Sequence, residues 1–434
     1  MPTTTANLPN LLTRTYNREE YFAPHERILT KFLDSVEDFP DGGKPLGSAR
    51  YFGVRTADSH SVGGTAEGGD LPTFNPPQIL QCSVSAVQVS ASCSWSELML
   101  LVATGEGTLG EDIVDDHVKM TTRNLMTHLN FMTLGHGTGR LGVVETGGMG
   151  ATTVVFRNPE GVLQLRKGMT IDWYDTDTGG SKQGATSTVL SINFETRSIT
   201  IAAHDITAGW GAYRALSTSV SSYGIAPNGL RNVVDNGGLT AALFGITRSA
   251  SPEINATILN AAGGLQSYSE KLVRKMLNRI FFQTGLDADE IWMNEGIASE
   301  HYNLLTGNRV YQVGPSGRPA TPTFGMNQMD LGVQHNGKFI PFKIEGDLPA
   351  REMNAITKSL FRKHILRKAG WIGDGVGPDG ATGAVLMQAP SSTGQSYALS
   401  KVAGQLWVGN LAHLQPRANC AAREIFDEEL AQDA

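Results

Sequence analysis

The chain has 434 residues, a length that indicates two or three compact units rather than a single core. Lysine and arginine number 35 against 42 aspartates and glutamates, and the resulting net charge of -7 argues against tight nucleic-acid binding, which needs a basic surface. An apolar fraction of 40% excludes disorder, while a charged fraction of only 18% and a count of 50 glycines indicate many turns and much surface buried against neighbours.

Residues 1–44 are predicted to form an N-terminal arm, because a short helical stretch is followed by the turn-forming sequence "PDGGKP". Residues 45–93 are predicted to form an extended loop, a long β-hairpin with a polar, glycine-rich tip. At ~3.3 Å per residue, an arm of about 12 residues reaches roughly 40 Å, too far to bury both faces on its own domain. We therefore expect this loop to lie on another chain or to be mobile.

A long helix is predicted next, beginning near residue 108. Thr108 and Glu111 stand at capping-box spacing, which favours a helix start. One apolar stripe follows at steps of three and four residues, formed by Val114, Val118, Leu125, Leu129 and Met132. Behind the helix come Gly135, Gly137 and Gly139. We expect Gly135 to end the helix in a left-handed conformation and the other two glycines to allow a tight reversal of the chain.

Residues 151–220 are predicted to form a small antiparallel β-domain inserted into the larger fold, because apolar and polar residues alternate between glycine-rich turns. A second helix follows, with Ser267 and Glu270 at capping-box spacing and Gly285 as its C-cap. Further on, "EIWMN" predicts a strand, "IASEHYNLLTG" a helix, and "GQLWVGNLAHLQPRANCAAREI" two strands returning to the core. The basic segment "KSLFRKHILRK" is interpreted as a solvated helix face or a subunit contact.

The glycine-rich segment "GHGTGRLG" could suggest a phosphate-binding loop. Such a loop follows a strand and opens a helix, so that the positive end of the helix faces the phosphate. Here the order is reversed, because the glycines come after a helix, whose C-terminal end carries partial negative charge. We therefore interpret the segment as a structural turn and expect no nucleotide binding.

No catalytic or metal-binding constellation is recognised in the sequence. Asp115, Asp116 and His117 are adjacent and would point about 100° apart on a helix. Motifs of serine hydrolases and zinc hydrolases are absent. The three cysteines lack metal or redox spacing and are predicted to be buried in a reducing compartment. We expect a soluble protein that is not an enzyme and has no cofactor and no metal site.

The order of these features resembles that of tailed-phage major capsid proteins of the Hong Kong 97 type. The family's G-x-G-T-G turn after its spine helix is matched by Gly135, Gly137, Thr138 and Gly139. Members with an inserted β-domain carry a "G-M-x-I-D" sequence, which corresponds here to Gly168–Asp172. The stretch "LPTFNPP", beginning at Leu71 and Pro72, is similar to the end of the family's extended loop.

The resemblance implies an α+β Hong Kong 97-type capsid fold with an inserted β-domain. The arm and extended loop would precede a spine helix and peripheral domain, which the β-domain interrupts, and an axial domain would come before the return of the chain. The expected boundaries are 1–44 (arm), 45–93 (extended loop), 94–150 (spine helix and peripheral domain), 151–220 (β-domain), 221–288 (peripheral domain continued), 289–405 (axial domain) and 406–434 (return and C-terminal tail).

The function implied by the resemblance is that of a major capsid protein in a virion. Such proteins form hexamers and pentamers of an icosahedral shell that encloses double-stranded DNA without sequence-specific binding, and they are made in the cytoplasm of the host bacterium. The extended loop would contact the neighbouring subunit. The residues we expect at that contact are Tyr51, Phe52, Arg55, Leu71, Pro72 and Phe74. Other implied partners are a portal protein and a cement or decoration protein, and the chain would not contact a membrane.

Two departures from the family carry further expectations. Some members have a helical scaffolding segment of about a hundred residues before the arm, which the 44 residues here cannot contain, so we expect a separate scaffolding protein. Other members crosslink a lysine of the extended loop to a neighbouring subunit. No lysine occurs between Lys44 and Lys119, so we expect a non-covalent shell.

Three rival interpretations remain open from the sequence. An encapsulin-like nanocompartment shell shares the same fold and would enclose protein rather than DNA. A hydrolase or nucleotide-binding enzyme with a β-insert would need a convergent polar site, which no motif supports. A tail-tube or other β-rich virion protein is disfavoured by the long helix.

Overall fold

The computed structural model divides the chain into two compact units. The residues that it describes are 32–39, 49–57, 61–65, 67, 69–70, 73–74, 76–96, 109–157, 160–176, 179–215, 223–260, 264–307, 332–371, 387–390 and 397–426. Of these, the smaller unit contains 86–96, 109–130, 365–371, 387–390 and 397–409, and the larger unit contains the others. Within the described part of the chain, no helix is long and apolar enough to cross a membrane.

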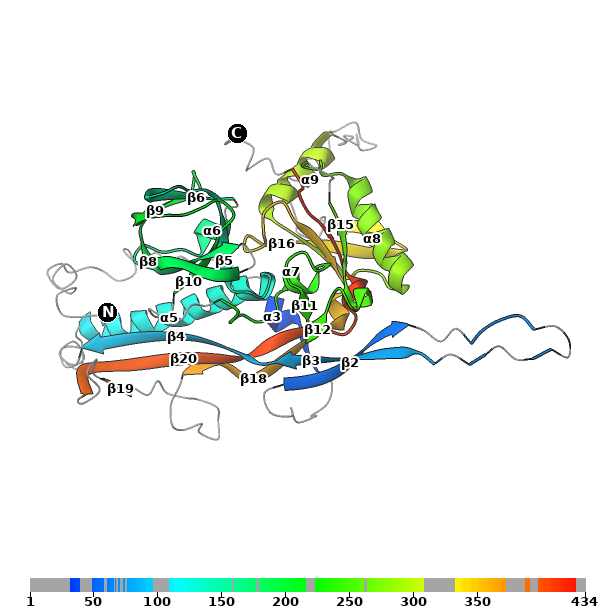
Figure 1. Cartoon of the computed structure of the whole chain (residues 1–434), viewed down its shortest axis with the longest axis horizontal. Helices are drawn as coiled ribbons and strands as arrows, with labels where there is room; N and C mark the ends of the chain where they lie inside the picture. The colour runs from blue at the N-terminus through cyan, green and yellow to red at the C-terminus, as the bar shows by residue number, and fades with distance from the viewer. Residues whose placement is uncertain are drawn as a thin grey trace, which may run out of the picture. The chain divides into compact units, whose positions relative to one another are not determined.

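The smaller unit combines a long helix with long strands (Figure 1). The helix α5, Leu109–Leu134, has 26 residues, and its last turn belongs to the larger unit. Strand β4 (Val87–Ser96) pairs antiparallel with β20 (Tyr397–His413) along its whole length, and β20 also borders β18 (Phe361–Trp371) and β19 (Met387–Pro390). The side-chain amide of Gln405 on β20 donates to Thr122 Oγ1 on α5 at 2.5 Å, which ties the sheet to the helix.

A closed barrel forms the first part of the larger unit after α5. Its strands are β5 (Arg140–Thr146), β6 (Ala151–Phe156), β7 (Thr170–Thr176), β8 (Gly179–Asn193), β9 (Ser198–His204) and β10 (Gly211–Arg214). They pair in the order β10-β5-β6-β9-β8-β7, and β7 closes the ring on β10; Figure 1 shows the barrel with β5, β6, β8, β9 and β10 labelled. Trp173 and Phe156 stack in its core, and the short helix α6 (Glu160–Leu163) contributes Val162.

A mixed six-stranded sheet forms the other core of the larger unit. Its order is β13 (Thr257–Leu259), β21 (Cys420–Ala422), β17 (Met353–Ile356), β14 (Glu290–Met293), β16 (Lys338–Ile344) and β15 (Gly332–His335). The helices α8 (Glu270–Thr284) and α9 (Glu295–Gly307) pack into one core with this sheet. The buried stripe of α8 consists of Leu272, Val273, Met276, Leu277 and Ile280, at helical spacing. Trp292 of β14 contacts Phe32 of α3 (Phe32–Ser35), with ring centroids 5.1 Å apart.

Strands β2 (Ala49–Ala57) and β3 (Gln78–Ser85) form a two-stranded hairpin, with Ala49 opposite Ser85 and Ala57 opposite Gln78. Short elements complete the described chain. They are β1 (Glu37–Asp38), α7 (Leu230–Val233), β11 (Ala242–Leu243), β12 (Ile246–Thr247) and the 3-10 turns η2 (Pro252–Ile254), η4 (Lys358–Leu360) and η5 (Pro416–Ala418). Strand β1 runs parallel to the start of β18.

The structure confirms the long helix, the flanks of the hairpin, the antiparallel β-domain and the two final strands. The β-domain starts earlier than the predicted residue 151, because β5 lies in the barrel and pairs with both β6 and β10. The basic segment at residues 358–368 is not a helix. It forms the turn η4 and most of β18, because strands on both sides of it supply backbone hydrogen-bond partners.

The predicted start of α8 is wrong by two residues. Gln266 is held in a parallel β-bridge to Ile425, so the chain is still extended there. The N-cap is Ser269 rather than Ser267, and its side chain accepts a hydrogen bond from the amide of Leu272 at 3.3 Å. Glu270 is the first helical residue, and Gly285 is a left-handed C-cap with φ 71°, as predicted.

The predicted cap of α5 lies partly outside the described residues. The helix begins at Leu109, directly after Thr108, but Thr108 and the side chain of Glu111 are not among the described parts of the chain. This cap therefore stays a prediction.

Candidate functional site

The turn after α5 carries two left-handed glycines, and they are not the ones that end the helix. Gly137 has φ 79° and Gly139 has φ 80°. Gly135, which we expected to be left-handed, keeps a helical hydrogen bond, because its amide donates to the carbonyl of Phe131 at 3.0 Å. The chain therefore reverses two to four residues further on, at Gly137 and Gly139. At these two positions the backbone is left-handed, and an L side chain would be strained. The turn leads directly into strand β5 of the barrel.

The turn packs closely against residues 224–232. A side chain on Gly229 would overlap the carbonyl oxygen of Gly135, so the glycine at position 229 allows this backbone contact. A side chain on Gly137 would meet the side-chain nitrogen (Nδ2) of Asn232 at 2.9 Å. The carbonyl of Thr138 accepts a hydrogen bond from the amide of Gly224 at 2.9 Å. Three of the four predicted turn residues therefore make close contacts with one neighbouring segment.

His136 is buried between these glycines. Its Nδ1 lies 2.7 Å from Thr138 Oγ1. Burial, with the nearby guanidinium groups of Arg140 and Arg231, lowers the pKa of His136 well below its usual value. The imidazole is therefore neutral near pH 7, and the two side chains in the middle of the turn are hydrogen-bonded to each other.

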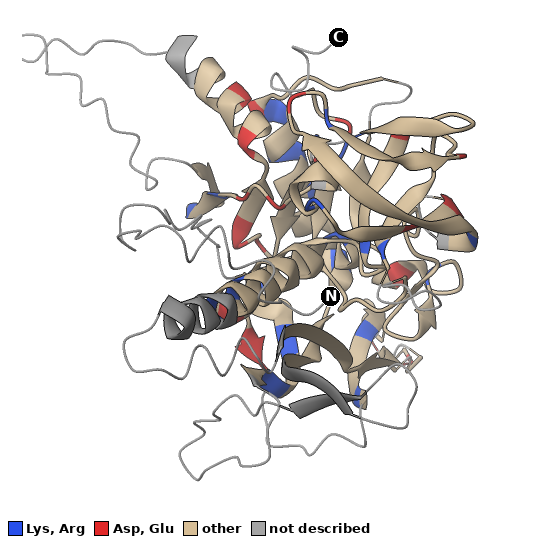
Figure 2. Cartoon of the chain, turned by 90° about the vertical axis from the view of Figure 1, so that its left-hand side faces the viewer, with Lys and Arg blue, Asp and Glu red and all other residues tan. Residues whose placement is uncertain are grey.

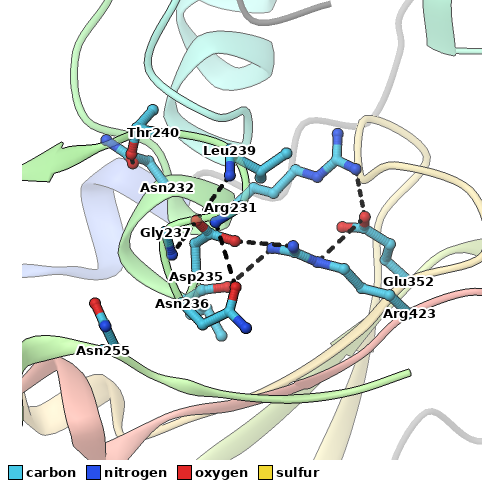
Figure 3. A network of polar contacts seen from close by, with 12 residues as sticks. Arg231, Asn232, Asp235, Asn236, Gly237, Leu239, Thr240, Asn255, Glu352 and Arg423 are labelled. Carbon is cyan, nitrogen blue, oxygen red and sulfur yellow. Dashed lines mark hydrogen bonds and ion pairs between the residues drawn. The ribbon is translucent and has the colours of Figure 1, made fainter. Parts of the chain in front are cut away.

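Asn232 connects the turn to a buried polar network (Figure 3). Its side-chain oxygen accepts from Thr240 Oγ1 at 2.5 Å, and its backbone carbonyl accepts from Arg248. The Arg248 side chain also donates to the carbonyl of Asp235 at 2.7 Å. Burial lowers the pKa of Arg248 to about 10, while the nearby Asp235 opposes this shift. Arg248 thus stays charged at neutral pH and holds two backbone carbonyls in place.

Asp235 is the buried anion of this network. One of its oxygens accepts from Arg423 at 2.8 Å, and the other accepts from the amides of Gly237 and Leu239 at 2.9 and 3.0 Å. Burial alone would raise the pKa of Asp235, but Arg423 and the amides outweigh it, so the pKa is lowered. The carboxylate stays ionised and is committed to fixed partners. It acts as a structural tie and not as an acid or base.

Glu352 adds a second carboxylate. It pairs with Arg231, and its Oε1 lies 3.5 Å from Nε of Arg423. Two guanidinium groups, of Arg231 and Arg423, thus pair with two carboxylates in this network, and Figure 3 shows Arg423 between Asp235 and Glu352. Arg423 is 188 residues away from Asp235 in sequence, so the network joins the segment beside the turn to the last described strand region.

The predicted contact residues of the extended loop are only partly described. Tyr51 and Phe74 are 55% and 76% exposed, whereas Phe52 packs against Phe244 with ring centroids 5.4 Å apart. Arg55 is exposed and lies on β2. Leu71 and Pro72 lie outside the described residues. The structure therefore brings the turn residues together at one site but leaves two hairpin aromatics exposed on another surface.

Sequence reasoning missed the buried arginine network. Asp235, Arg248 and Glu352 do not follow a known motif, and their partners come from segments far apart in the chain. The one available signal was "DNGG" at residues 235–238, which predicts a tight turn and matches the amide contacts of Asp235. Among the described residues, no group of three or more His, Cys, Asp or Glu side chains is arranged to hold a metal ion.

Comparisons with known proteins concern the fold. No protein-family model matches the sequence, and no curated protein matches it. Among solved structures, a chain of the capsid asymmetric unit of cyanophage A-1(L) is similar over 96% of this chain and 99% of that chain, with a TM-score of 0.55 and 13% identity. Capsid chains of the Myoviridae phage XM1 (TM-score 0.44, 9% identity, 94% and 96% covered) and of a native GTA particle (0.45, 8%, 98% and 100%) are also similar. The chain has the Hong Kong 97-type capsid fold.

Proposed function

We propose that this chain is the major capsid protein of a tailed double-stranded DNA phage. In this proposal, copies assemble as hexamers and pentamers into an icosahedral shell around the genome. The observation that carries the proposal is the agreement in fold with a cyanophage capsid chain over almost the full length of both chains. Since one fold can serve several functions, the surface of the chain supplies separate support.

That support comes from the β2–β3 hairpin. Tyr51, Phe74 and Ile79 are 55%, 76% and 68% exposed. Large apolar side chains that stay exposed along one ribbon indicate an interaction surface. We propose that the extended loop (45–93) lies across a neighbouring subunit and contacts it through Tyr51, Phe52, Arg55, Leu71, Pro72 and Phe74.

The expected division into domains carries over to this proposal with one change. The arm (1–44) and the axial domain (289–405) keep their predicted bounds, and the first part of the peripheral domain is shortened from 94–150 to 94–139, with 221–288 and the return at 406–434 unchanged. The inserted β-domain begins with the barrel strand β5 at Arg140. The glycine turn then joins the spine helix to the barrel, and the arginine network holds the segment behind the barrel to the last strands.

The distribution of charge supports a container rather than a sequence-specific DNA-binding protein. Figure 2 shows lysines and arginines scattered among aspartates and glutamates along the ribbon. With a net charge of -7, the subunit would enclose DNA without binding its phosphates tightly. We propose a separate scaffolding protein, a portal protein and a cement or decoration protein as partners, virion localisation, and synthesis in the bacterial cytoplasm.

Electron microscopy of the purified assembly tests the proposal. We expect uniform icosahedral shells with resolved hexamers and pentamers, and double-stranded DNA inside particles from infected cells. Shells that contain protein cargo instead of DNA would favour an encapsulin-like nanocompartment. Particles that never exceed a small oligomer would refute both.

A denaturing gel of mature particles tests the non-covalent shell. The absence of lysine between Lys44 and Lys119 leaves the extended loop without an amine for a crosslink. We expect one band near 46.5 kDa. A ladder of higher bands would contradict the expectation without affecting the proposed assembly.

A further inference from the structure

The outward face of α8 is basic. Lys271, Arg274, Lys275 and Arg279 are all exposed, and they recur at three- and four-residue steps. The helix carries a single acidic residue, Glu270, in its first turn. The apolar stripe on the opposite side of α8 is buried in the core of the six-stranded sheet. The basic face therefore points away from that core.

Three of these cations have no partner within the part of the chain that is described. Lys271, Lys275 and Arg279 make no hydrogen bond or ion pair there, and Arg274 has only an exposed pair with Glu270 at 3.6 Å. Beside them lies a shallow groove of about 660 Å³, lined also by Asn278 and Phe282. Phe282 is 82% exposed. A row of cations next to an exposed ring suits an acidic segment that also carries apolar residues.

The described chain ends beside the start of this helix. Gln266 donates to the carbonyl of Glu424 at 2.7 Å, and Phe426 donates to the carbonyl of Gln266 at 2.8 Å. Ile425 is fully buried in the same core as the apolar stripe of α8. These contacts fix residue 426 next to residue 266, just before the N-cap of α8 at Ser269.

The residues that follow have the complementary charge. Residues 427–434, "DEELAQDA", carry four carboxylates and no basic group. Extended at ~3.3 Å per residue, this segment spans roughly 26 Å. The helix α8, with 15 residues at ~1.5 Å each, is about 22 Å long. The acidic segment therefore starts at one end of the basic face and has the length to follow it to the other end.

We propose that residues 427–434 dock along the basic face of α8 in the same chain, with the carboxylates against the four cations and Gln432 near Phe282. The short connection keeps the segment at high local concentration near this face, so that exposed ion pairs suffice to hold it. Docked there, it acts as an internal polyanion and keeps other polyanions, DNA included, away from α8.

A pair of engineered cysteines tests the docking in the full-length protein. Phe282→Cys and Gln432→Cys change no charge, and Phe282 is exposed, so the fold is expected to persist. Under mild oxidation we expect an intrachain disulfide, seen as a mobility shift on a non-reducing gel and as a linked peptide by mass spectrometry.

The matched control pairs Gln432→Cys with Phe194→Cys, another exposed phenylalanine, on the barrel turn; it is expected to stay reduced. Disulfide-linked dimers would show that a second copy supplies the segment, and no specific disulfide would show that it does not dock; either result overturns the proposal.

Charge reversal tests the complementarity. In the cysteine pair, Lys271→Glu, Arg274→Glu and Lys275→Glu together are expected to lower the rate of disulfide formation roughly tenfold, since several exposed ion pairs are lost at once. Adding Asp427→Lys, Glu428→Lys and Glu429→Lys is expected to restore it. Circular dichroism checks that each variant is folded. A rate that is insensitive to the reversal, or that the second set does not restore, would overturn the proposal.

Discussion

The barrel and the β2–β3 hairpin are both built from extended chain, yet they bury their apolar side chains differently. In the barrel, every strand has a partner on each side, and Ile171 and Trp173 are fully buried. In the hairpin, β2 and β3 pair as strands only with each other; Val54, Cys82 and Val84 are buried, but Ile79, and Phe74 between the strands, remain largely exposed. Closure removes the unpaired strand edges and completes a core within the barrel, whereas the open two-stranded ribbon keeps unpaired edges and covers only part of its apolar side chains within the chain.

This difference separates what one subunit stabilises by itself from what it leaves to an assembly. The barrel core contributes to the free energy of unfolding of an isolated chain. The hairpin aromatics contribute little until another surface covers them. In the proposed shell, the barrel core stabilises each subunit by itself, whereas the exposed hairpin side chains stabilise the contact between subunits.

The largest expected effect comes from emptying the barrel core. Trp173→Ala removes a fully buried ring and its hydrogen bond to Ser187. We expect the free energy of unfolding to fall by about 3–5 kcal/mol. Denaturant unfolding of the unassembled protein measures it. The matched exposed variant, Phe74→Ala, is expected to unfold like the parent. If both variants lost the same free energy of unfolding, the hairpin side chain would stabilise the isolated subunit as much as the barrel core does, which would contradict the comparison.

The turn that leads into the barrel gives the next largest effect. Gly137→Val places a branched side chain at φ 79° and against the amide of Asn232. We expect a loss of about 2–4 kcal/mol from backbone strain and overpacking, with low yield of folded protein or of shells. Nucleotide affinity is expected to stay absent.

Gly148→Ala is the control for this variant, because nothing lies within 4 Å of the added carbon. Its yield is expected to match the parent. A normal yield of intact shells from Gly137→Val would mean that the turn has been misread.

The pH dependence of stability sharpens the comparison further. The pKa of His136 is lowered in the folded protein by burial and by nearby arginines, and burial lowers the pKa of His413 to about 3. Below about pH 6.5, these two histidines bind protons in the unfolded chain but remain neutral in the folded chain. Stability is therefore full above pH 6.5 and falls as the pH decreases, by about 1.4 kcal/mol per pH unit for each histidine. Unfolding midpoints between pH 7.5 and 5 measure the slope.

Replacement of the turn histidine separates the two contributions. His136→Gln is expected to reduce the acid slope to that of the remaining buried histidines, while His204→Gln, a half-buried residue on the barrel, is the matched control. An unchanged slope in His136→Gln would show that the turn histidine does not titrate in this way.

The smallest expected change in subunit stability belongs to the hairpin. Phe74→Ser with Ile79→Ser removes two exposed apolar side chains. We expect no measurable change in the unfolding curve but a strong loss of shells, counted by electron microscopy. Shells at the parental yield would refute the proposed contact of the extended loop.

Elements with strong local patterns could be predicted from the sequence. The apolar stripe of α8, its C-cap Gly285 and the strand that follows are set by short-range spacing. The same holds for the glycine turn, although the left-handed residues are Gly137 and Gly139 and not Gly135. The helix already uses the amide of Gly135, and no local pattern reports on that bond.

Features that depend on distant partners could not be predicted. The segment at residues 358–368 has the composition of a solvated helix, but pairing with β1 and β20 makes it a strand. The start of α8 shifts to Ser269 because Ile425 holds Gln266 extended. The ion pair of Asp235 and Arg423 spans 188 residues, and neither residue has a neighbour in sequence that points to the other.

The position of β21 has a consequence for how the chain is made. Strand β21 (Cys420–Ala422) lies between β13 and β17, inside the six-stranded sheet. Until the ribosome has released residues 420–422, β13 therefore has no neighbour in this sheet, and the inner edge of β17 stays open. A nascent chain with an unpaired strand edge and an unfinished core is prone to aggregate. The six-stranded sheet can thus be completed only after residue 422 has been synthesised, whereas the barrel, complete by residue 214, can close earlier.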